Sequence, residues 1–504
     1  MQRAGSPSES SGVSAEDLKD RIELFLLELQ HPVLSEPGRE MMDLSSSNYS
    51  LVSEYNKLLW HVWNDRLNYV RQITGIHKER PGKMELRFQK FGKGPPGTLI
   101  LAETRAGAEQ LERRSERAHY AHTLRQFLAQ LFPQWKIEVL STETDLRHSF
   151  SGCYARGMLV RGQRAWAVIG AGEHEEPHIT DEILTYALIW LDWLRRRHPE
   201  RVLEGLKIFV PPKRSAATQQ RLSWLDLAAA RWEIYETGDP IVRRDPMDAG
   251  NLRICLAPAG GPSVTTPAFQ SWTDRVRSLD SAIEARFITE RYGGLAYRGL
   301  PFAKETAQGP VFGVGRAETP LREDNFGSLQ RLIAGLQRYR CSRSPNRLHP
   351  YYRLRSEKWM QSEMVRQIGV LGYDLVPDAL YEQVPAVSGT ERGLLDLLAV
   401  NLQGRLAVVE FKVSEDIHLP LQALDYWMRV REYLQRGEFK RQGYFPQRGL
   451  SSQEPLLLLV SPALQFHPAC ETVIRYFSPS IEVVRVGLNE EWREQLQVLF
   501  RTGR

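Results

Sequence analysis

Two carboxylates and one lysine near the C-terminus stand in strand-like runs that are otherwise apolar. In the run 405–412, RLAVVEFK, alternation places Glu410 and Lys412 on one face and three apolar residues on the other. Because both faces are mainly apolar, we expect a buried strand. The run 393–400, GLLDLLAV, is apolar except for Asp396. A carboxylate in such a strand is costly unless it is paired or binds a metal.

These residue types suit metal-assisted hydrolysis of a phosphate ester. Adjacent strands would bring Asp396 and Glu410 together as an all-oxygen ligand set, which fits Mg²⁺ or Mn²⁺. A metal there activates a water and neutralises the phosphate, and Lys412 would orient that water or stabilise the developing charge. The alternative is a buried salt bridge between Lys412 and Glu410, with Asp396 capping a turn.

The spacing Asp-x13-Glu-x-Lys of Asp396, Glu410 and Lys412 resembles the motif of PD-(D/E)XK nucleases. Leu395 stands where the name of the motif has proline, a common departure in that superfamily. The dipeptide Pro377-Asp378 matches the name better, but no (D/E)XK follows it at hairpin distance. The resemblance therefore implies a magnesium-dependent nuclease whose reactive centre is built on the first three residues.

Within that superfamily, residues 393–427 resemble most the catalytic domain of NucS-type mismatch endonucleases. There the same strands are followed by a helix with Gln-x3-Tyr, which is here Gln422 and Tyr426. The resemblance implies catalytic roles for both. It covers the C-terminal third of the chain, and the remaining two-thirds shows no match to that family. Mismatch specificity is therefore not implied.

A helix expected over Ser356–Leu371 offers a third metal ligand beside Asp396 and Glu410. The superfamily often takes a further acidic ligand from the first helix of the domain. At 100° per residue, Glu357 lies on the apolar stripe of this helix, whereas Glu363 points about 100° away from it. Glu357 is therefore the preferred ligand. The alternative is a solvated first-turn glutamate favoured by the helix dipole.

A basic stretch leads directly into this helix. Cationic side chains neutralise phosphates and tyrosines stack on bases, so the stretch is a candidate nucleic-acid contact. The alternative is a solvated linker. The candidate contact residues are Arg338, Arg340, Arg343, Arg347, Arg353 and Arg355.

The elements that must position these residues are expected from periodicity. The C-terminal segment should form helix, three strands, helix, strand, helix and strand, with Gly404 in a tight turn between the second and third strands. The fold class is therefore mixed α/β, and the resemblance to PD-(D/E)XK nucleases implies a restriction-endonuclease-like αβββαβ core. The expected domains are a disordered tail over 1–14, a small α+β domain over 15–105, an α/β domain over 111–239, a Gly/Pro-rich connector with one helix over 240–347, and the nuclease domain over 348–504.

The α/β domain over 111–239 resembles the nuclease domain in its sequence pattern and in its expected order of elements. RAWAVIGAGE aligns with RLAVVEFKVSE at an offset of 241, and a long Trp-bearing helix, a strand, a short helix and a strand follow each run. At the aligned positions Ile169 replaces Glu410 and Ala171 replaces Lys412. We expect a second, degenerate copy of the fold that pairs with the active one as a pseudo-dimer. The alternative is that βαβ order recurs in many α/β proteins.

In the small domain over 15–105, helices are expected near Asp17–Gln30 and Tyr49–Gly75, before two strands. The second helix is suggested by Leu58, Leu59 and Val62 at helical spacing.

Composition restricts the remaining function classes. With 504 residues, 42% hydrophobic and 25% charged, the chain can bury several cores, and its net charge of +5 is too small to identify a nucleic-acid binder by itself. Its four cysteines form no CxxC pair, which argues against a zinc site or a disulfide framework. The first residues lack the apolar region of a signal peptide, and the most apolar helix, Ile183–Leu194, is too short to span a membrane.

The expected function is phosphodiester hydrolysis in a cytoplasmic protein without membrane association, acting as a pseudo-dimer or a homodimer. DNA is favoured as the substrate over RNA. One alternative is an inactive nucleic-acid-binding or assembly protein built on nuclease-like domains. The other is an RNA-processing nuclease, since the motif does not itself distinguish the sugar.

Overall fold

The computed structural model describes residues 15–29, 32–36, 42–44, 48–54, 57–63, 68–89, 97–103, 108–145, 148–248, 254–259, 266–287, 293–315, 318–388 and 391–504. The expected tail over 1–14 lies outside the described residues. The chain divides into two compact units, Met1–Glu112 with Leu348–Pro350 and Arg113–Arg347 with Tyr351–Arg504. Among the described residues, no helix is long and apolar enough to cross a membrane.

The first unit is a small α+β fold with one seven-stranded antiparallel sheet, in the order β2-β1-β7-β6-β5-β4-β3. The helix α1 (Ala15–Glu28) packs on this sheet. The strands are β1 (Pro32–Ser35), β2 (Met42–Asp43), β3 (Asn48–Glu54), β4 (Lys57–Trp63), β5 (Asn68–Arg80), β6 (Lys83–Gln89) and β7 (Gly97–Glu103).

The predicted helix over Tyr49–Gly75 is wrong, because this segment forms β3, β4 and part of β5. In β4, burial alternates: Leu58, Trp60 and Val62 are almost fully buried, while the residues between them are half-buried. The apolar residues of this run fit both a helical and an alternating pattern. Pairing on both sides, with β3 and β5, decides for the strand.

The C-terminal part of the second unit is a seven-stranded mixed sheet with the order β14-β20-β21-β22-β23-β24-β25. The pairs β20·β21 and β21·β22 are antiparallel, β22·β23 and β23·β24 are parallel, and β24·β25 is antiparallel. The strands are β14 (Ile254–Leu256), β20 (Leu375–Ser388), β21 (Glu391–Asn401), β22 (Leu406–Phe411), β23 (Leu456–Pro462), β24 (Val483–Leu488) and β25 (Val498–Gly503).

Helices cover both faces of this C-terminal sheet. On one face, α8 and the 3-10 turn η3 share a core with β21, β22 and β23. On the other, α9 and α11 belong to a second, larger core. The helical elements are α8 (Ser356–Arg366), η3 (Ile368–Leu371), α9 (Leu419–Gln435), α10 (Glu438–Arg441) and α11 (Ala469–Ile474). The helices and strands predicted for this segment are therefore present, except that its first helix ends five residues early and continues as η3.

The segment over 111–239, together with β13 from the expected connector, forms a six-stranded sheet that repeats this topology. Its order is β13-β12-β11-β10-β9-β8, with antiparallel pairs β8·β9, β9·β10 and β12·β13 and parallel pairs β10·β11 and β11·β12. Read from β8 to β13, order and direction equal those from β20 to β25. The elements are α2 (Ala108–Leu131), β8 (Lys136–Ser141), β9 (Ala155–Arg161), β10 (Arg164–Gly170), α3 (Pro177–Arg197), β11 (Val202–Val210), α4 (Ala216–Leu222), β12 (Arg231–Glu236) and β13 (Val242–Arg244).

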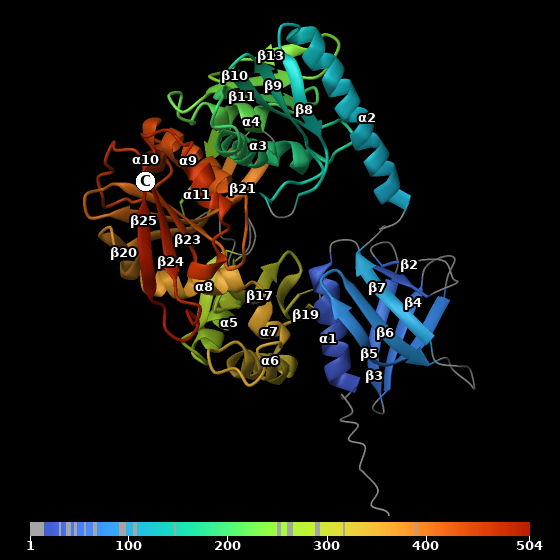
Figure 1. The fold of residues 1–504 in the computed structure, drawn as a ribbon. Coiled ribbons are helices and arrows are strands. Elements are labelled where there is room, and N and C mark those ends of the chain that lie inside the picture. Colours follow the sequence, from blue (N-terminus) through green and yellow to red (C-terminus); the bar gives the residue numbers. More distant parts are fainter. Residues whose placement is uncertain are drawn as a thin grey trace, which may run out of the picture. The chain divides into compact units, whose positions relative to one another are not determined.

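The two mixed sheets are joined by helices that lie between them (Figure 1). The helix α3 of the upstream sheet packs on α11 of the C-terminal sheet, and α4 packs on α9. The apolar side chains of these helices merge into one continuous core that draws on both sheets. The two sheets therefore form one packed body within the second unit.

The expected connector over 240–347 has a fold of its own and is more than a linker with one helix. It holds a five-stranded antiparallel sheet with a separate apolar core, and α5 accompanies the predicted helix α6. Its described elements are α5 (Pro267–Arg277), β15 (Ile283–Phe287), β16 (Gly293–Tyr297), β17 (Leu300–Thr306), β18 (Gly309–Phe312), β19 (Thr319–Pro320) and α6 (Phe326–Tyr339), and α7 (Pro350–Arg353) follows. Glycine and proline stand inside several of its short strands, such as Gly293 and Gly294 in β16 and Pro301 in β17, and this obscured the strand pattern.

Candidate active site

The carboxylates of Asp396 and Glu410 stand on neighbouring strands of the C-terminal sheet. Leu397 of β21 pairs with Val409 of β22 in an antiparallel register. Asp396, one residue before Leu397, therefore lies opposite Glu410, one residue after Val409. Residues of β22 alternate between two cores. Leu406 and Val408 belong to the core on the α9 side, and Ala407 and Val409 belong to the core on the α8 side. The predicted alternation of this strand, and its burial on both faces, are confirmed.

Asp396 is held by donors from three directions. Its Oδ2 accepts the backbone N–H of Phe411 at 3.2 Å, which ties the carboxylate to β22. Its Oδ1 accepts Lys358 Nζ of α8 at 2.7 Å and Gln383 Nε2 of β20 at 3.3 Å. Gln383 lies opposite Asp396 with φ of 52°, in the left-handed region that a non-glycine residue adopts only under strain. The local backbone of β20 is thus distorted where it faces this carboxylate.

Glu410 is the most deeply buried acid of the site. Only 5% of the residue is exposed, and within the described chain its Oε2 has no hydrogen-bond partner. Burial raises the pKa of the Glu410 carboxyl well above its usual range, and the charge of Asp396 raises it further. The ammonium groups of Lys412 and Lys358 oppose this rise. A buried carboxylate oxygen without a donor is costly, which is characteristic of a site that receives a cation or a proton.

Lys412 is a permanent cation beside these acids. Burial alone would lower its pKa, but the carboxylates of Glu357, Glu410 and Asp416 outweigh burial and raise the pKa of Lys412. Its Nζ lies 3.3 Å from Asp416 Oδ2. Because the amine stays protonated at neutral pH, it can stabilise negative charge or orient a water, but it is a poor general base.

Glu357 in the first turn of α8 faces this cluster, whereas Glu363 does not. Burial raises the pKa of Glu357, the charge of Lys412 opposes the rise and that of Asp396 adds to it, which places Glu357 among the site charges. Glu363 instead accepts Arg298 at 2.8 Å and Trp359 Nε1 at 3.2 Å. Glu363 is therefore committed to Arg298 and Trp359, while metal binding by Glu357 stays a prediction.

Tyr426 and Gln422 occupy one face of α9, one turn apart, in different surroundings. Burial raises the pKa of the Tyr426 hydroxyl, and the charges of Glu410 and Asp396 raise it further, so this hydroxyl is a neutral donor near both acids. Gln422 lines a cavity of about 180 Å³ at the junction with the upstream sheet. The other lining residues are His178, Asp181, Glu182, Thr185, Ala217, Arg221, His418 and Leu421.

Within the described ranges, no three Asp, Glu, His or Cys side chains are arranged to hold a metal ion as they stand. No protein-family model matches the chain, and no curated protein matches it. The function must therefore follow from the chemistry of the site: a buried carboxylate (Glu410) and a half-buried one (Asp396) on paired strands, a third carboxylate on a helix, and two lysines.

Sequence patterns missed the polar residues of α8 and the loop after β22. Lys358 pairs with Asp396, and Gln361 donates to the backbone oxygen of Asp396 at 2.7 Å and to Glu382 at 2.8 Å. Gln361 is almost fully buried. A glutamine on the apolar stripe of an expected helix was the available signal, since a buried amide needs partners across the fold. Asp416 carried no such signal, because its loop position is common for any polar residue.

The assignment of Arg340 as a nucleic-acid contact is wrong. The residue is fully buried, and its guanidinium donates to backbone carbonyls of five residues. Burial lowers the pKa of Arg340 to about 9. These acceptors are the carbonyl oxygens of Tyr297, Arg298, Tyr351, Leu354 and Arg355.

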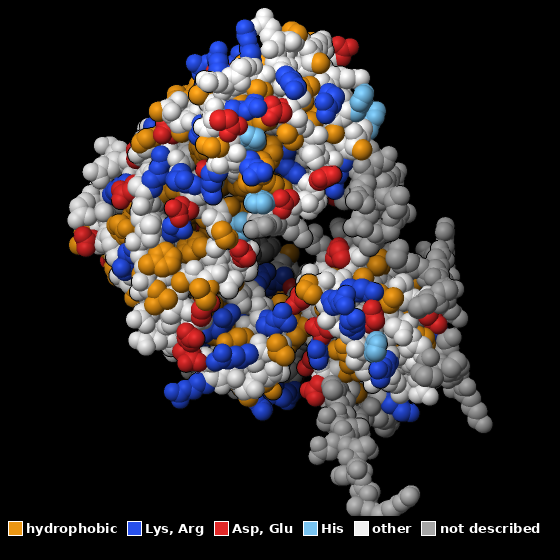
Figure 2. Space-filling model, viewed as in Figure 1, with side chains coloured by type: hydrophobic (Ala, Val, Ile, Leu, Met, Phe, Trp, Pro, Cys, Tyr) orange, Lys and Arg blue, Asp and Glu red, His pale blue; other side chains and the backbone are white. Residues whose placement is uncertain are grey.

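The other five arginines of the stretch are exposed, and nucleic-acid binding by them stays a prediction. Arg347 forms an ion pair with Glu494 at 3.1 Å, and the guanidinium of Arg338 lies over the ring of Tyr339. Figure 2 shows basic side chains over the region of α5 to α7, interspersed with acidic ones. The remaining exposed members are Arg343, Arg353 and Arg355.

Removing the charge of Glu410 should stabilise the fold at neutral pH. Because the folded-state pKa is raised, the native state binds a proton that the unfolded state releases, so wild-type stability falls as pH rises from about 4.3 through the folded pKa. The side chain of the Glu410→Gln variant is uncharged at every pH. We expect its free energy of unfolding to exceed that of the wild type at pH 7, without added metal, and the gap to close near pH 4.

Urea denaturation at several pH values measures this difference. Glu415→Gln is the matched control, since Glu415 is an exposed glutamate of the adjoining loop and its loss should change little. A Glu410→Gln variant that is less stable than the wild type at pH 7 would show that a partner compensates the Glu410 charge.

Proposed function

We propose that the chain is a magnesium-dependent nuclease of the PD-(D/E)XK type, acting on DNA through Asp396, Glu410 and Lys412. The observation that carries the proposal is the buried Glu410 Oε2 without a donor, set beside Asp396 with a protonated lysine two residues further on. A salt bridge between Glu410 and Lys412 is the structural alternative. Lys412 instead pairs with Asp416, and that contact leaves Glu410 without the partner the alternative requires.

The donor set fits Mg²⁺ or Mn²⁺ by its chemistry. All candidate ligands are carboxylate oxygens, and Mg²⁺ binds through one or two protein carboxylates while keeping several waters. Asp396 and Glu410 would hold the ion. Glu357 would add a third carboxylate, since the charges of Lys412 and Asp396 also act on it. When bound, the metal polarises the phosphate and lowers the pKa of a coordinated water. Lys358 donates to Asp396 Oδ1 at 2.7 Å, so it would share this carboxylate with a bound cation.

The side chains of the site then have separable tasks in hydrolysis. A water oxygen bonds to phosphorus, one phosphorus–oxygen ester bond breaks, and the leaving alkoxide takes up a proton. Lys412 neutralises the charge that develops on the phosphate oxygens. Tyr426, held neutral near both acids, can donate a hydrogen bond to water or phosphate. Lys358, which pairs with Asp396, would provide a second cation near the substrate.

We expect cleavage to require Mg²⁺ or Mn²⁺ and to fail with Ca²⁺ or after chelation. Ca²⁺ shares the oxygen preference but takes more ligands at longer distances, so it binds such sites without placing the water for attack. A panel of duplex, single-stranded, branched and mismatched DNA, with RNA alongside, measures both metal dependence and substrate class. Cleavage of RNA alone would favour the RNA-processing nuclease.

Full activity after exhaustive chelation would contradict the proposed mechanism. Binding of DNA without cleavage in any metal would favour the inactive assembly protein instead. For that alternative, the pairing of Lys358 with Asp396 would be a permanent structural contact.

A further inference from the structure

The two mixed sheets meet in a manner that repeats itself about a local twofold axis. Leu225, three residues after α4 ends, forms an antiparallel bridge with Phe477, three residues after α11 ends. The two hydrogen bonds beside this bridge are reciprocal. Asp226 donates its N–H to Tyr476 O at 2.8 Å, and Ser478 donates its N–H to Trp224 O at 2.7 Å.

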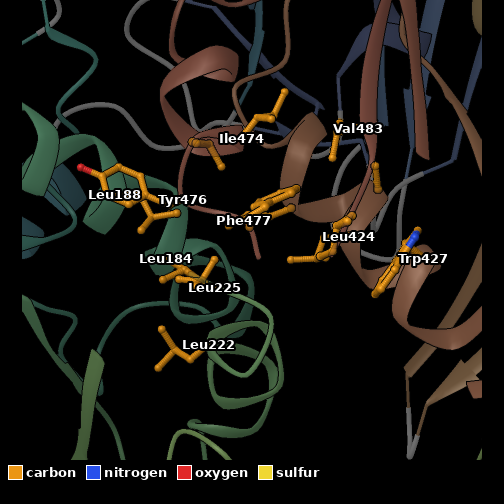
Figure 3. Close-up of a cluster of buried hydrophobic side chains, with 14 of the residues drawn as sticks. Leu184, Leu188, Leu222, Leu225, Leu424, Trp427, Ile474, Tyr476, Phe477 and Val483 are labelled. Atoms are coloured by element: carbon orange, nitrogen blue, oxygen red, sulfur yellow. The ribbon is translucent and has the colours of Figure 1, made fainter. Parts of the chain in front are cut away.

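The helix contacts repeat in the same reciprocal way. The long helix of each sheet packs on the short helix of the other, α3 on α11 and α9 on α4. Figure 3 shows apolar side chains of this junction, with Leu222 and Leu225 from one copy and Leu424 and Phe477 from the other, which belong to one core. Because each copy offers the same elements to its partner, the contact has the form of an isologous interface within one chain.

The upstream copy has lost the chemistry at each equivalent position. In its sheet, Ile169 of β10 pairs with Arg156 of β9, at the place where Glu410 faces Asp396 in the C-terminal sheet. Arg156 is 5% exposed and donates to the carbonyl oxygens of Ser151, Tyr154 and Glu143, so it is committed to the fold. A cation and an aliphatic side chain thus replace both carboxylates, and Ala171 replaces the lysine.

A continuous set of contacts leads from the active centre to the equivalent position of the upstream sheet, where Arg156, Ile169 and Ala171 stand. Asp416, which pairs with Lys412, accepts the N–H of His418 at 2.8 Å. The ring of His418 lies 5.4 Å from that of Tyr186 on α3, and Tyr186 lies 4.8 Å from Tyr154, directly before β9. Both centres therefore border the same junction, at the ends of β22 and β10.

We infer that the chain is a built-in pseudo-dimer with one catalytic centre, which nicks one strand of a duplex seated across the junction. This single-strand cleavage rests on the proposed function and specifies how many strands of the duplex are cut. A symmetric nuclease dimer presents two centres to the two strands, which are themselves related by twofold symmetry. Here one of the two positions carries Arg156, Ile169 and Ala171. Each binding event then consumes one water and breaks one phosphodiester bond.

A supercoiled plasmid distinguishes one cut from two. With the full chain in Mg²⁺, we expect open-circular DNA to accumulate without linear product until the supercoiled form is consumed. Asp396→Asn should remove nicking and so exclude a contaminating enzyme. Equilibrium dialysis with Mn²⁺ gives a second readout, in which one tight site per chain is expected and Asp396→Asn removes it.

Linear DNA that appears together with the open circle from the start would overturn the inference while leaving the proposed function intact. The same holds for a second tight Mn²⁺ site per chain, or for linear product whose rate rises with the square of protein concentration, as a homodimer would give. Absence of both cleavage and Mn²⁺ binding would contradict the proposed function, and this inference with it.

Discussion

Replacing Glu410 with Gln, Asp396 with Asn or Lys412 with Met should each lower DNA cleavage by about 10²-fold or more, the usual cost of removing one group that stabilises transition-state charge. The two carboxyl variants should also lose metal binding. In the wild type, Mn²⁺ binding should raise the unfolding midpoint by mass action, and this shift should vanish in both. Lys412→Met should keep the shift, because its amine acts on the substrate.

The matched control for these variants is Asp378→Asn. Asp378 belongs to the Pro-Asp dipeptide of the chain, yet its side chain is 80% exposed and pairs with Arg448. Its loss should leave cleavage unchanged. Equal loss of activity in Asp378→Asn and Asp396→Asn would mean that the carboxylate pair on β21 and β22 is not the reactive centre.

Replacing Arg340 with Met should destabilise the second unit by about 3 kcal/mol or more, because each buried carbonyl left without a donor costs about 1–3 kcal/mol. The five residues that contribute these carbonyls come from the β16–β17 turn and from the chain just before α8. Arg340 thus fixes the start of the helix that carries Glu357 and Lys358. We therefore expect a loss of cleavage that follows the loss of structure.

Urea denaturation with and without Mn²⁺ measures this effect. Arg343→Met is the matched control, since Arg343 is exposed and three residues away, and its stability should be unchanged within about 0.5 kcal/mol. Arg340→Lys should recover little, because an ammonium cannot reach acceptors that a planar guanidinium spans. Unchanged stability in Arg340→Met, with weaker DNA binding, would restore Arg340 as a phosphate contact.

The sequence by itself determined most elements of the two mixed sheets, including one strand of the site, but not the edge strands β13, β14 and β25. The alternation in 405–412 and its apolar character on both faces determine a buried strand, and β22 is one. The order of strands and helices in 111–239 and 348–504 was also predictable, because these runs are long and their periods differ clearly. The short strands of the first unit and of 240–347 were not, since their apolar residues fit more than one period or are broken by glycine and proline.

Tertiary structure alone decided which charged groups meet. Lys358 precedes Asp396 by 38 residues, and nothing local distinguishes it from its basic neighbours, yet it forms the ion pair. Arg340 and Arg343 look alike in sequence, but one is enclosed by carbonyls from two segments and the other is exposed. Local sequence pattern indicates which face of a helix or strand is apolar, but it does not determine which charged side chain finds a buried partner. That partner depends on chain segments that are distant in sequence, as does the twofold pairing of Leu225 with Phe477.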